Sequence, residues 1–122
     1  MTANPFVILY VEDDELVRES LVELLATPGR RIVAVADVAA ARQALRENNV
    51  NLLITDLNLG DDSGLDLARE ALAQNPRLPV IICSGHDSTA LVRSLGPTAH
   101  ALRKPVGLDE LERLIDRLAT ST

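Results

Sequence analysis

The chain has 122 residues and a formal net charge of −6, and 47% of its residues are hydrophobic. This length allows one domain with a single core, and the hydrophobic content is typical of a folded protein. The acidic balance argues against nucleic-acid binding, because contacts to phosphates need clustered lysine and arginine. No apolar run is long enough to span a membrane, no signal peptide is visible, and the single Cys83 excludes a disulfide framework. Together these features favour a cytoplasmic protein.

Five short segments predict strands: residues 6–11, 31–36, 52–56, 79–83 and 99–103. The first, third and fourth are apolar without alternation, which indicates strands buried on both faces. The second alternates loosely and is expected to be more exposed, and the fifth is rather polar. The core between them must be aliphatic, since Phe6 and Tyr10 are the only aromatic residues.

A helix is predicted after each strand, from apolar residues at helical spacing. Asp14 is expected to cap the first helix, and Ser63 to open the third with Asp66 three residues on. The second covers about 39–45, and the fourth is short and ends near Leu95. The predicted inner faces are Val17, Leu21, Leu24 and Leu25 in the first helix, Leu65, Ala68 and Leu72 in the third, and Leu108, Leu111, Leu114, Ile115 and Leu118 in the last.

Strands that alternate with helices imply right-handed crossovers and a parallel sheet covered on both faces. The sequence therefore predicts a doubly wound α/β fold with a five-stranded parallel sheet. No internal repeat or linker interrupts the pattern, so residues 1–122 are expected to form one domain.

Polar residues follow four of the predicted strands: Glu12 and Asp13, then Asp56, Ser84 and Lys104. In a doubly wound parallel sheet the carboxyl ends of the strands lie along one edge, so these side chains should meet. Taken alone, Asp56 could simply end its strand and cap a turn. Clustered carboxylates cannot all stay ionised unless a cation joins them, and Mg²⁺ is the natural candidate.

This combination suits phosphoryl transfer, which needs a nucleophile and positive charge near the phosphoryl oxygens. Asp56 is the best nucleophile, because it stands alone on the central strand between the acidic pair and Lys104. A carboxylate that attacks phosphorus gives an aspartyl phosphate. Lys104 could hold a phosphoryl oxygen or pair with Asp56, and Ser84 supplies a hydroxyl donor.

The chain resembles the CheY-like receiver domain of two-component response regulators over essentially its whole length. The matching residues are Val11 to Asp14, Asp56 with Leu59 and Gly64 downstream, Ser84–Gly85, and Lys104–Pro105. Each match is weak alone, but their order and their positions at strand ends make the signal strong. The resemblance implies a flavodoxin-like (βα)5 fold with strand order 2-1-3-4-5.

The resemblance also implies a role for each matching residue. Asp56 would be the phosphoacceptor, Asp13 the direct Mg²⁺ ligand and Glu12 its water-mediated partner. Asn58 would offer its backbone carbonyl to the metal and act with His86 as a modulator, although a lone surface histidine is usually just solvated. Ser84 and Lys104 would contact the phosphoryl group. The Lys104–Pro105 bond is expected to be cis.

The sequence departs from the family pattern at several positions. Glu12 stands where aspartate is commoner, and Gly60 replaces a proline, which should loosen the loop after Asp56. The segment from Ser84 to Lys104 is shorter than usual by about half a helical turn. Ala101 occupies the switch position where the family generally has Tyr or Phe, and His100 is its neighbour and a possible substitute.

The main hypothesis is a phosphorylatable signalling domain that receives its phosphoryl group from a histidine kinase or a histidine phosphotransfer protein. It would catalyse only its own phosphorylation and dephosphorylation, without nucleic-acid or membrane partners, and a homodimer through the last helices is a further expectation. One alternative is an aspartyl-phosphate phosphatase of the haloacid-dehalogenase kind, but Asn58 stands where that enzyme needs an acid. Another is a receiver-like binding module, against which the intact Asp13, Asp56, Ser84 and Lys104 argue.

Overall fold

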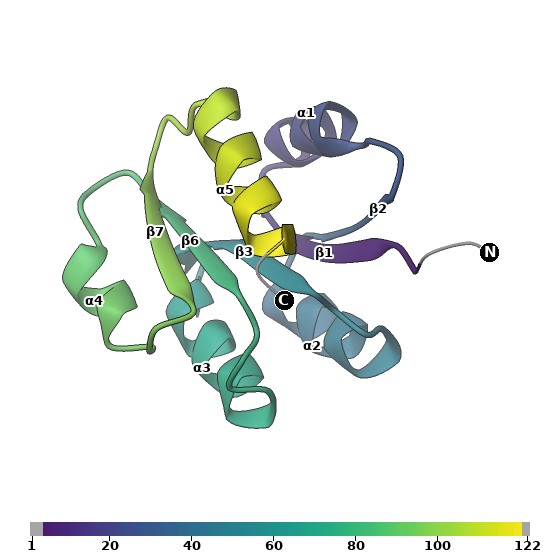
Figure 1. Ribbon diagram of the computed structural model, residues 1–122. Helices are drawn as coiled ribbons and strands as arrows, with labels where there is room; N and C mark the ends of the chain where they lie inside the picture. The colour runs from purple at the N-terminus through teal and green to yellow at the C-terminus, as the bar shows by residue number, and fades with distance from the viewer. Residues whose placement is uncertain (1–3, 121–122) are drawn as a thin grey trace.

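The computed structural model describes residues 4–120 and confirms the doubly wound α/β fold (Figure 1). Its five-stranded sheet has the order β2-β1-β3-β6-β7, and all neighbours are parallel. The strands are β1 (Phe6–Val11), β2 (Arg30–Val35), β3 (Leu52–Asp56), β6 (Val80–Ser84) and β7 (Ala99–Arg103). The helices are α1 (Glu15–Leu25), α2 (Val38–Glu47), α3 (Gly64–Gln74), α4 (Thr89–Arg93) and α5 (Leu108–Thr120). The expected order 2-1-3-4-5 is confirmed, because β6 and β7 are the fourth and fifth strands of this sheet.

The three central strands are buried, as their apolar sequences predict. Every residue of β3 and β6 is buried, and in β1 only Phe6 is partly exposed. The edge strands β2 and β7 are only partly buried, which explains their more polar sequences. Because all five strands run the same way, their carboxyl ends share one edge of the sheet.

Helices cover both faces of this sheet (Figure 1). Residues of α2, α3 and α4 pack with one face in one core cluster, and residues of α1 and α5 pack with the other face in a second cluster. Both clusters are aliphatic apart from Tyr10 and Cys83, with Phe6 at the margin of the second. The aliphatic core expected from the composition is thus confirmed.

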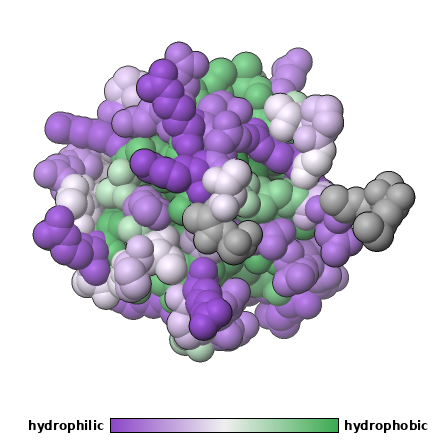
Figure 2. All heavy atoms as spheres, viewed as in Figure 1, coloured by the Kyte–Doolittle hydropathy of each residue, from purple (hydrophilic) through white to green (hydrophobic). Residues whose placement is uncertain are grey.

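The predicted inner face of α1 is partly wrong. Leu25 is buried and Leu21 half-buried, but Val17 is 47% exposed and Leu24 54% exposed. Val17 borders an open pocket rather than the core, and Leu24 faces solvent, because α1 meets the sheet along a stripe narrower than its apolar pattern. Hydrophobic side chains accordingly show at the surface near α1 and α5 (Figure 2).

The predictions for α3 and α5 are better. Ser63 caps α3, since its Oγ accepts a hydrogen bond of 3.2 Å from the backbone N–H of Asp66. The inner faces are confirmed, with Leu65, Ala68 and Leu72 buried in α3 and Leu111, Leu114, Ile115 and Leu118 buried in α5. Leu108 is the exception, 37% exposed, because it is the first residue of α5 and lies before the helix reaches the core.

A short hairpin that the sequence analysis did not predict follows β3. In it β4 (Asn58–Leu59) pairs antiparallel with β5 (Asp62–Ser63) through a turn at Gly60 and Asp61. Gly60 has φ of +62°, which proline cannot adopt and which suits the first turn position of a tight hairpin. Gly60 therefore has a defined geometric role in this turn, and the expectation that it loosens the loop stays a prediction.

Candidate functional site

The polar residues predicted to meet do lie together at the carboxyl edge of the sheet. Glu12 and Asp13 follow β1, Asp56 and Ser84 end β3 and β6, and Lys104 follows β7. The parallel register makes them neighbours: Asp56 is paired with Cys83, and the N–H of Lys104 donates to the Ser84 carbonyl at 2.7 Å. Three acidic groups, a hydroxyl and an ammonium thus come from four separate strands.

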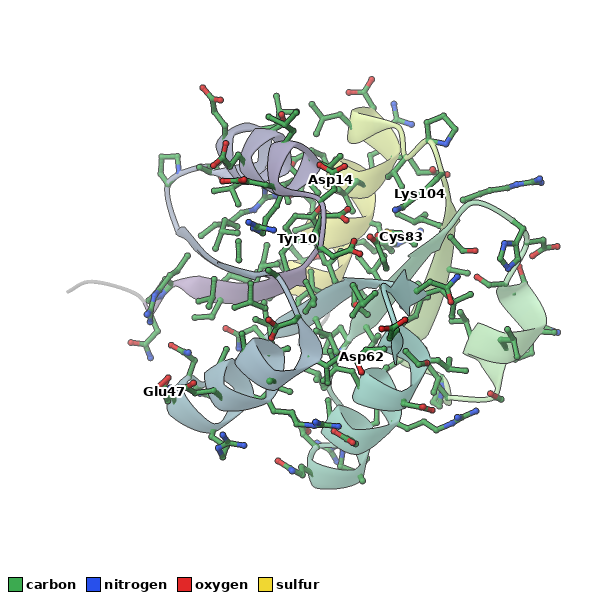
Figure 3. The ribbon with its side chains drawn as sticks, turned by 180° about the vertical axis from the view of Figure 1, so that it is seen from behind. Tyr10, Asp14, Glu47, Asp62, Cys83 and Lys104 are labelled. Carbon is green, nitrogen blue, oxygen red and sulfur yellow. The ribbon has the colours of Figure 1, made fainter. Side chains whose placement is uncertain are left out.

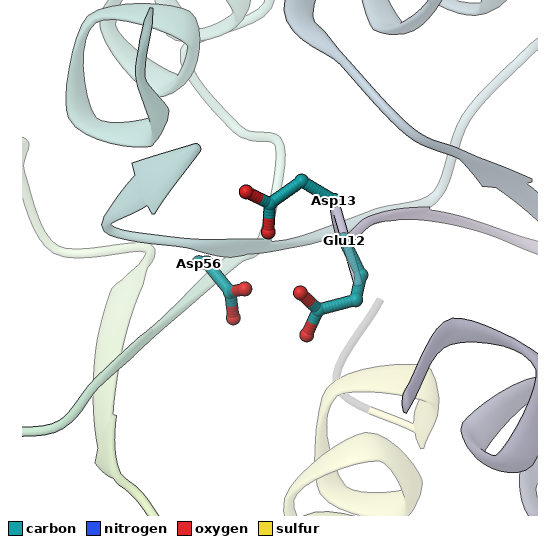
Figure 4. Close-up of side chains that lie close together, drawn as sticks. All are labelled: Glu12, Asp13 and Asp56. Atoms are coloured by element: carbon teal, nitrogen blue, oxygen red, sulfur yellow. The ribbon is translucent and has the colours of Figure 1, made fainter. Parts of the chain in front are cut away.

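Carboxylate oxygens of Glu12, Asp13 and Asp56 lie within 4.8 Å of one another (Figure 4). Glu12 and Asp56 are buried, with 3% and 6% of their surface exposed, whereas Asp13 is exposed. Two effects chiefly raise the pKa of Glu12 from its ordinary 4.5 to about 7: the larger is burial, and the smaller is a hydrogen bond in which Glu12 and Asp56 share a proton. The protein alone therefore does not neutralise this cluster at physiological pH, and the donor set is suited to a hard divalent cation.

Lys104 provides the positive charge of the site. Its Nζ lies 2.9 Å from Asp56 Oδ1 and 3.9 Å from Glu12 Oε1. Burial alone would lower the pKa of Lys104, but the hydrogen bond to Asp56 and the nearby negative charges outweigh it and raise this pKa. Lys104 is therefore an ammonium at neutral pH. The expected cis bond between Lys104 and Pro105 is confirmed.

Ser84 and His86 lie beside the acidic cluster with different exposures. Ser84 is 4% exposed, and its Oγ accepts a hydrogen bond of 3.2 Å from the backbone N–H of His86. This bond leaves the Ser84 hydroxyl hydrogen free to donate elsewhere. His86 is exposed in the loop after β6, and Asn58 is exposed at the start of β4. The roles assigned to these residues stay predictions.

The two residues considered for the switch position face opposite sides of β7. Ala101 packs against the cluster that contains Val92 of α4, whereas His100 pairs with Ile81 of the α1–α5 cluster. Burial, and then the charge of Arg117 on α5, lower the pKa of His100. The register thus puts Ala101, and not His100, on the α4 face, and the part of either residue in a switch stays a prediction. The short α4 is confirmed, with five residues.

An apolar pocket of about 510 Å³ adjoins the acidic site on the α1–α5 face of the sheet. Figure 3 shows Tyr10, Cys83 and Lys104 near one another in this region. The pocket is lined by Tyr10, Glu12, Val17, Leu21, Ile54, Asp56, Cys83, Lys104, Pro105, Val106 and Leu111. Burial in this setting raises the pKa of the Cys83 thiol to about 12, so the interpretation of Cys83 as a core residue is sound.

The roles of two residues of the site, Tyr10 and Gly64, were not identified from the sequence. Tyr10 lies two positions before Glu12, and this spacing puts both side chains on one face of the strand. Its hydroxyl donates to Glu12 Oε1 at 3.4 Å. Gly64 lies against the backbone of Asp56, where a side chain would not fit. The role of Tyr10 could have been found from strand periodicity. The role of Gly64 depends on how closely α3 packs against the end of β3, which the sequence does not show.

Comparison with known proteins agrees with this geometry. The family model described as "Response regulator receiver domain" matches residues 8–116. CpdR, a response regulator receiver protein of Brucella abortus, is 33% identical over 113 residues, which are 91% of this chain and 94% of CpdR. The regulatory protein VirG of Agrobacterium fabrum is 33% identical over 107 residues, which are 84% of this chain but 42% of VirG. The chain thus spans less than half the length of VirG.

The solved structures show the same relationship. A response regulator receiver protein from Pseudomonas putida has a TM-score of 0.83 and 33% identity, and the match covers 96% of this chain and 99% of that one. A receiver domain from Clostridium thermocellum has a TM-score of 0.82 and 26% identity, with 92% of each chain covered. This chain belongs to the response regulator receiver domain family. It is a receiver domain of the kind found in two-component signalling systems.

Proposed function

We propose that Asp56 of this receiver accepts a phosphoryl group from a sensor histidine kinase or a histidine phosphotransfer protein. The observation that carries the proposal is the distance of 2.9 Å between Lys104 Nζ and Asp56 Oδ1, beside the acidic pair Glu12 and Asp13. A single carboxylate is here flanked by an ammonium on one side and by candidate metal ligands on the other. This is the arrangement that in-line phosphoryl transfer requires.

Asp56, Lys104 and Ser84 would each act in the transfer of the phosphoryl group. A carboxylate oxygen of Asp56 attacks the phosphorus atom, the bond from phosphorus to the donor's histidine nitrogen breaks, and the nitrogen leaves with the electron pair. Lys104 would move its ammonium from Asp56 alone to the phosphoryl oxygens. The Ser84 hydroxyl would donate to another of these oxygens, since its own oxygen already accepts from His86 N–H. The domain then acts as a catalyst only on its own phosphorylation and dephosphorylation.

The acidic residues fit Mg²⁺ as the cation of this site. Oxygens that bind one Mg²⁺ ion lie at most about 4.2 Å apart, so carboxylates within 4.8 Å need only a small closure. Asp13 would be the direct ligand with Asp56, Glu12 would act through water, and the Asn58 carbonyl would complete the protein ligands. Bound there, the ion would offset the carboxylate charge and polarise the phosphoryl group.

We further propose that residues 1–122 form one receiver domain that works in the cytoplasm. No helix within residues 4–120 is long and apolar enough to cross a membrane. The match covers 94% of CpdR but 42% of VirG, so both a receiver that stands alone and a receiver within a longer protein have relatives among the matches. A homodimer through the last helices and the lack of nucleic-acid binding stay predictions.

The test is phosphorylation by acetyl phosphate, followed by intact mass. The unmodified chain should gain the mass of one phosphoryl group only when Mg²⁺ is present. Asp56→Asn should abolish the gain, whereas Asp61→Asn, which removes a neighbouring exposed acid outside the cluster, should keep it.

Asp13→Ala should weaken Mg²⁺ binding measured by calorimetry. A full mass gain in Asp56→Asn would sink the assignment, and unchanged Mg²⁺ affinity in Asp13→Ala would mean that the acidic run only begins a helix.

A further inference from the structure

Tyr10 has its hydroxyl at the boundary between the apolar pocket and the acidic cluster. The side chain is 3% exposed and packs in the cluster that contains Ile54 and Leu111. A buried phenol usually needs a hydrogen-bond partner, and Glu12 Oε1, at 3.4 Å, is the acceptor that the structure provides. Burial and the charge of Glu12 raise the pKa of Tyr10, so the hydroxyl stays protonated and remains a donor.

Both carboxylate oxygens of Glu12 are held by the protein. Oε2 accepts the backbone N–H of Asp14 at 3.2 Å, and Oε1 faces the Tyr10 hydroxyl on one side and Lys104 Nζ, at 3.9 Å, on the other. The backbone carbonyl of Glu12 is held as well, by Arg18 Nη1 at 2.8 Å. The carboxylate therefore lies in one orientation, directed toward Asp56 (Figure 4).

The length of the Glu12 side chain explains why its carboxylate needs a residue that fixes its orientation. Glutamate has one more rotatable bond than aspartate, so its carboxylate can reach more positions and loses more entropy when it is fixed. The Asp14 N–H fixes one oxygen through the backbone. Tyr10 is the side chain that limits the second oxygen, because the remaining neighbour, Lys104, is engaged by Asp56 at the shorter distance of 2.9 Å.

We propose that Tyr10 is a positioning residue that orients the Glu12 carboxylate for the cation. The proposal rests on the cation site described above and adds a residue outside it. The Tyr10 hydroxyl should therefore affect Mg²⁺ affinity only when the acid at position 12 is long enough to reach it. An aspartate there is shorter by one carbon atom and would lie beyond the hydroxyl's reach.

The experiment is a double-mutant cycle on Mg²⁺ affinity with the whole chain, in which Mg²⁺ is titrated and followed by amide NMR shifts. Tyr10→Phe should weaken binding by about three- to tenfold. This is less than the roughly 10- to 100-fold usual for residues that hydrogen-bond a metal ligand, because the bond is long. In the Glu12→Asp background the same change should alter affinity less than about twofold. Urea unfolding of all four proteins checks that they fold, and no phosphodonor is needed.

A second readout uses the fact that Tyr10 is the only tyrosine in a chain without tryptophan. Its fluorescence should change when Mg²⁺ binds at the Glu12 carboxylate that the hydroxyl contacts, and this change should be lost in Glu12→Gln while the NMR titration still detects any residual binding. Equal losses of affinity from Tyr10→Phe in both backgrounds would show a purely structural role and overturn the proposal. Mg²⁺ binding that is unaffected by Tyr10→Phe would overturn it too. An unmodified chain that binds no Mg²⁺ would overturn this inference together with the cation site.

Discussion

A side chain at Gly64 would overlap the main-chain oxygen of Asp56 and lie 2.9 Å from Thr55 Oγ1. The first turn of α3 thus runs directly against the end of β3, and the Gly64 N–H donates to the Leu57 carbonyl at 2.8 Å. The Thr55 hydroxyl donates to the same Asp56 oxygen at 3.0 Å. The packing of α3 and the position of Asp56, the proposed phosphoacceptor, therefore depend on each other.

Gly64→Ala should destabilise the domain by about 1–3 kcal/mol, since the added methyl group forces the backbone of α3 and β3 apart. It should also slow phosphorylation by acetyl phosphate, because Asp56 moves with its backbone. Urea unfolding and intact mass measure the two effects. Gly107→Ala is the matched control, as its nearest neighbour would be Glu110 Cβ at an ordinary 3.9 Å. Equal unfolding midpoints in the two variants would contradict the role given to Gly64.

Arg30 joins the start of β2 to α5, and Arg30→Ala should lower stability by about 1–3 kcal/mol. Its side chain is 9% exposed and pairs with Glu112 at 2.8 Å and Asp116 at 3.1 Å, while Nη1 also donates to the Leu25 carbonyl. Removing a buried cation strands its partners, although their own exposure reduces the loss. The control is Arg42→Ala, whose pair with Glu70 is exposed to solvent and should contribute little to stability. A larger loss in Arg42→Ala would reverse this assignment.

Without Mg²⁺, the stability of the domain should fall as pH rises from about 4.5 to about 7. The ordinary pKa of glutamate is 4.5, and burial with a proton shared with Asp56 raises that of Glu12 to about 7. Between these values the folded protein keeps a proton that the unfolded chain has lost, so a higher pH favours unfolding. Urea midpoints at pH 5 and pH 7.5 measure the difference.

Two comparisons isolate the contribution of Glu12 to this pH dependence. Glu12→Gln should flatten the change between pH 5 and pH 7.5, whereas Glu23→Gln, at an exposed position of α1, should keep it. Mg²⁺ should oppose the loss and stabilise more at pH 7.5 than at pH 5, because it binds the ionised carboxylates. A midpoint that rises with pH in the metal-free protein would refute this account of Glu12.

The response to phosphorylation should be weak in α4 and stronger in the loops after β3 and β6. Ala101 has no side-chain rotamer to exchange, and α4 has only five residues to move. Amide NMR shifts with and without a beryllofluoride phosphoryl mimic test this expectation. His100→Ala should leave the pattern unchanged, since His100 faces α5. Large shifts throughout Thr89–Arg93 and β7 would show that the switch works without an aromatic residue.

The fold and the main site could be predicted because they depend on local patterns. Apolar runs such as Leu52–Asp56 mark the strands, and a parallel sheet brings their ends together whatever the detailed packing. Burial on α1 could not be predicted as well, because Val17 and Leu21 have similar patterns but only Leu21 reaches the core. Periodicity gives the direction of a side chain, and the distance between helix and sheet decides whether it is covered.

Two further features of the structure could not be predicted from the sequence. The hairpin depends on the positive φ of Gly60. Comparison with the family pattern showed only that a proline is absent at this position. His100 was a candidate for the switch, and the register of β7 with β6 puts it beside Ile81. The position of His100 follows from strand register, which the sequence of one strand does not determine.

The burial of Cys83 has a practical consequence for measuring motion in this domain. A thiol that is 7% exposed, with a pKa of about 12, has almost no thiolate at neutral pH and should not react with maleimides while the chain is folded. A cysteine introduced at an exposed position, such as Arg93 on α4, would then be the single point of attachment for a spin label or a dye. Changes in the mobility and surroundings of that one label could be followed without first removing the natural cysteine.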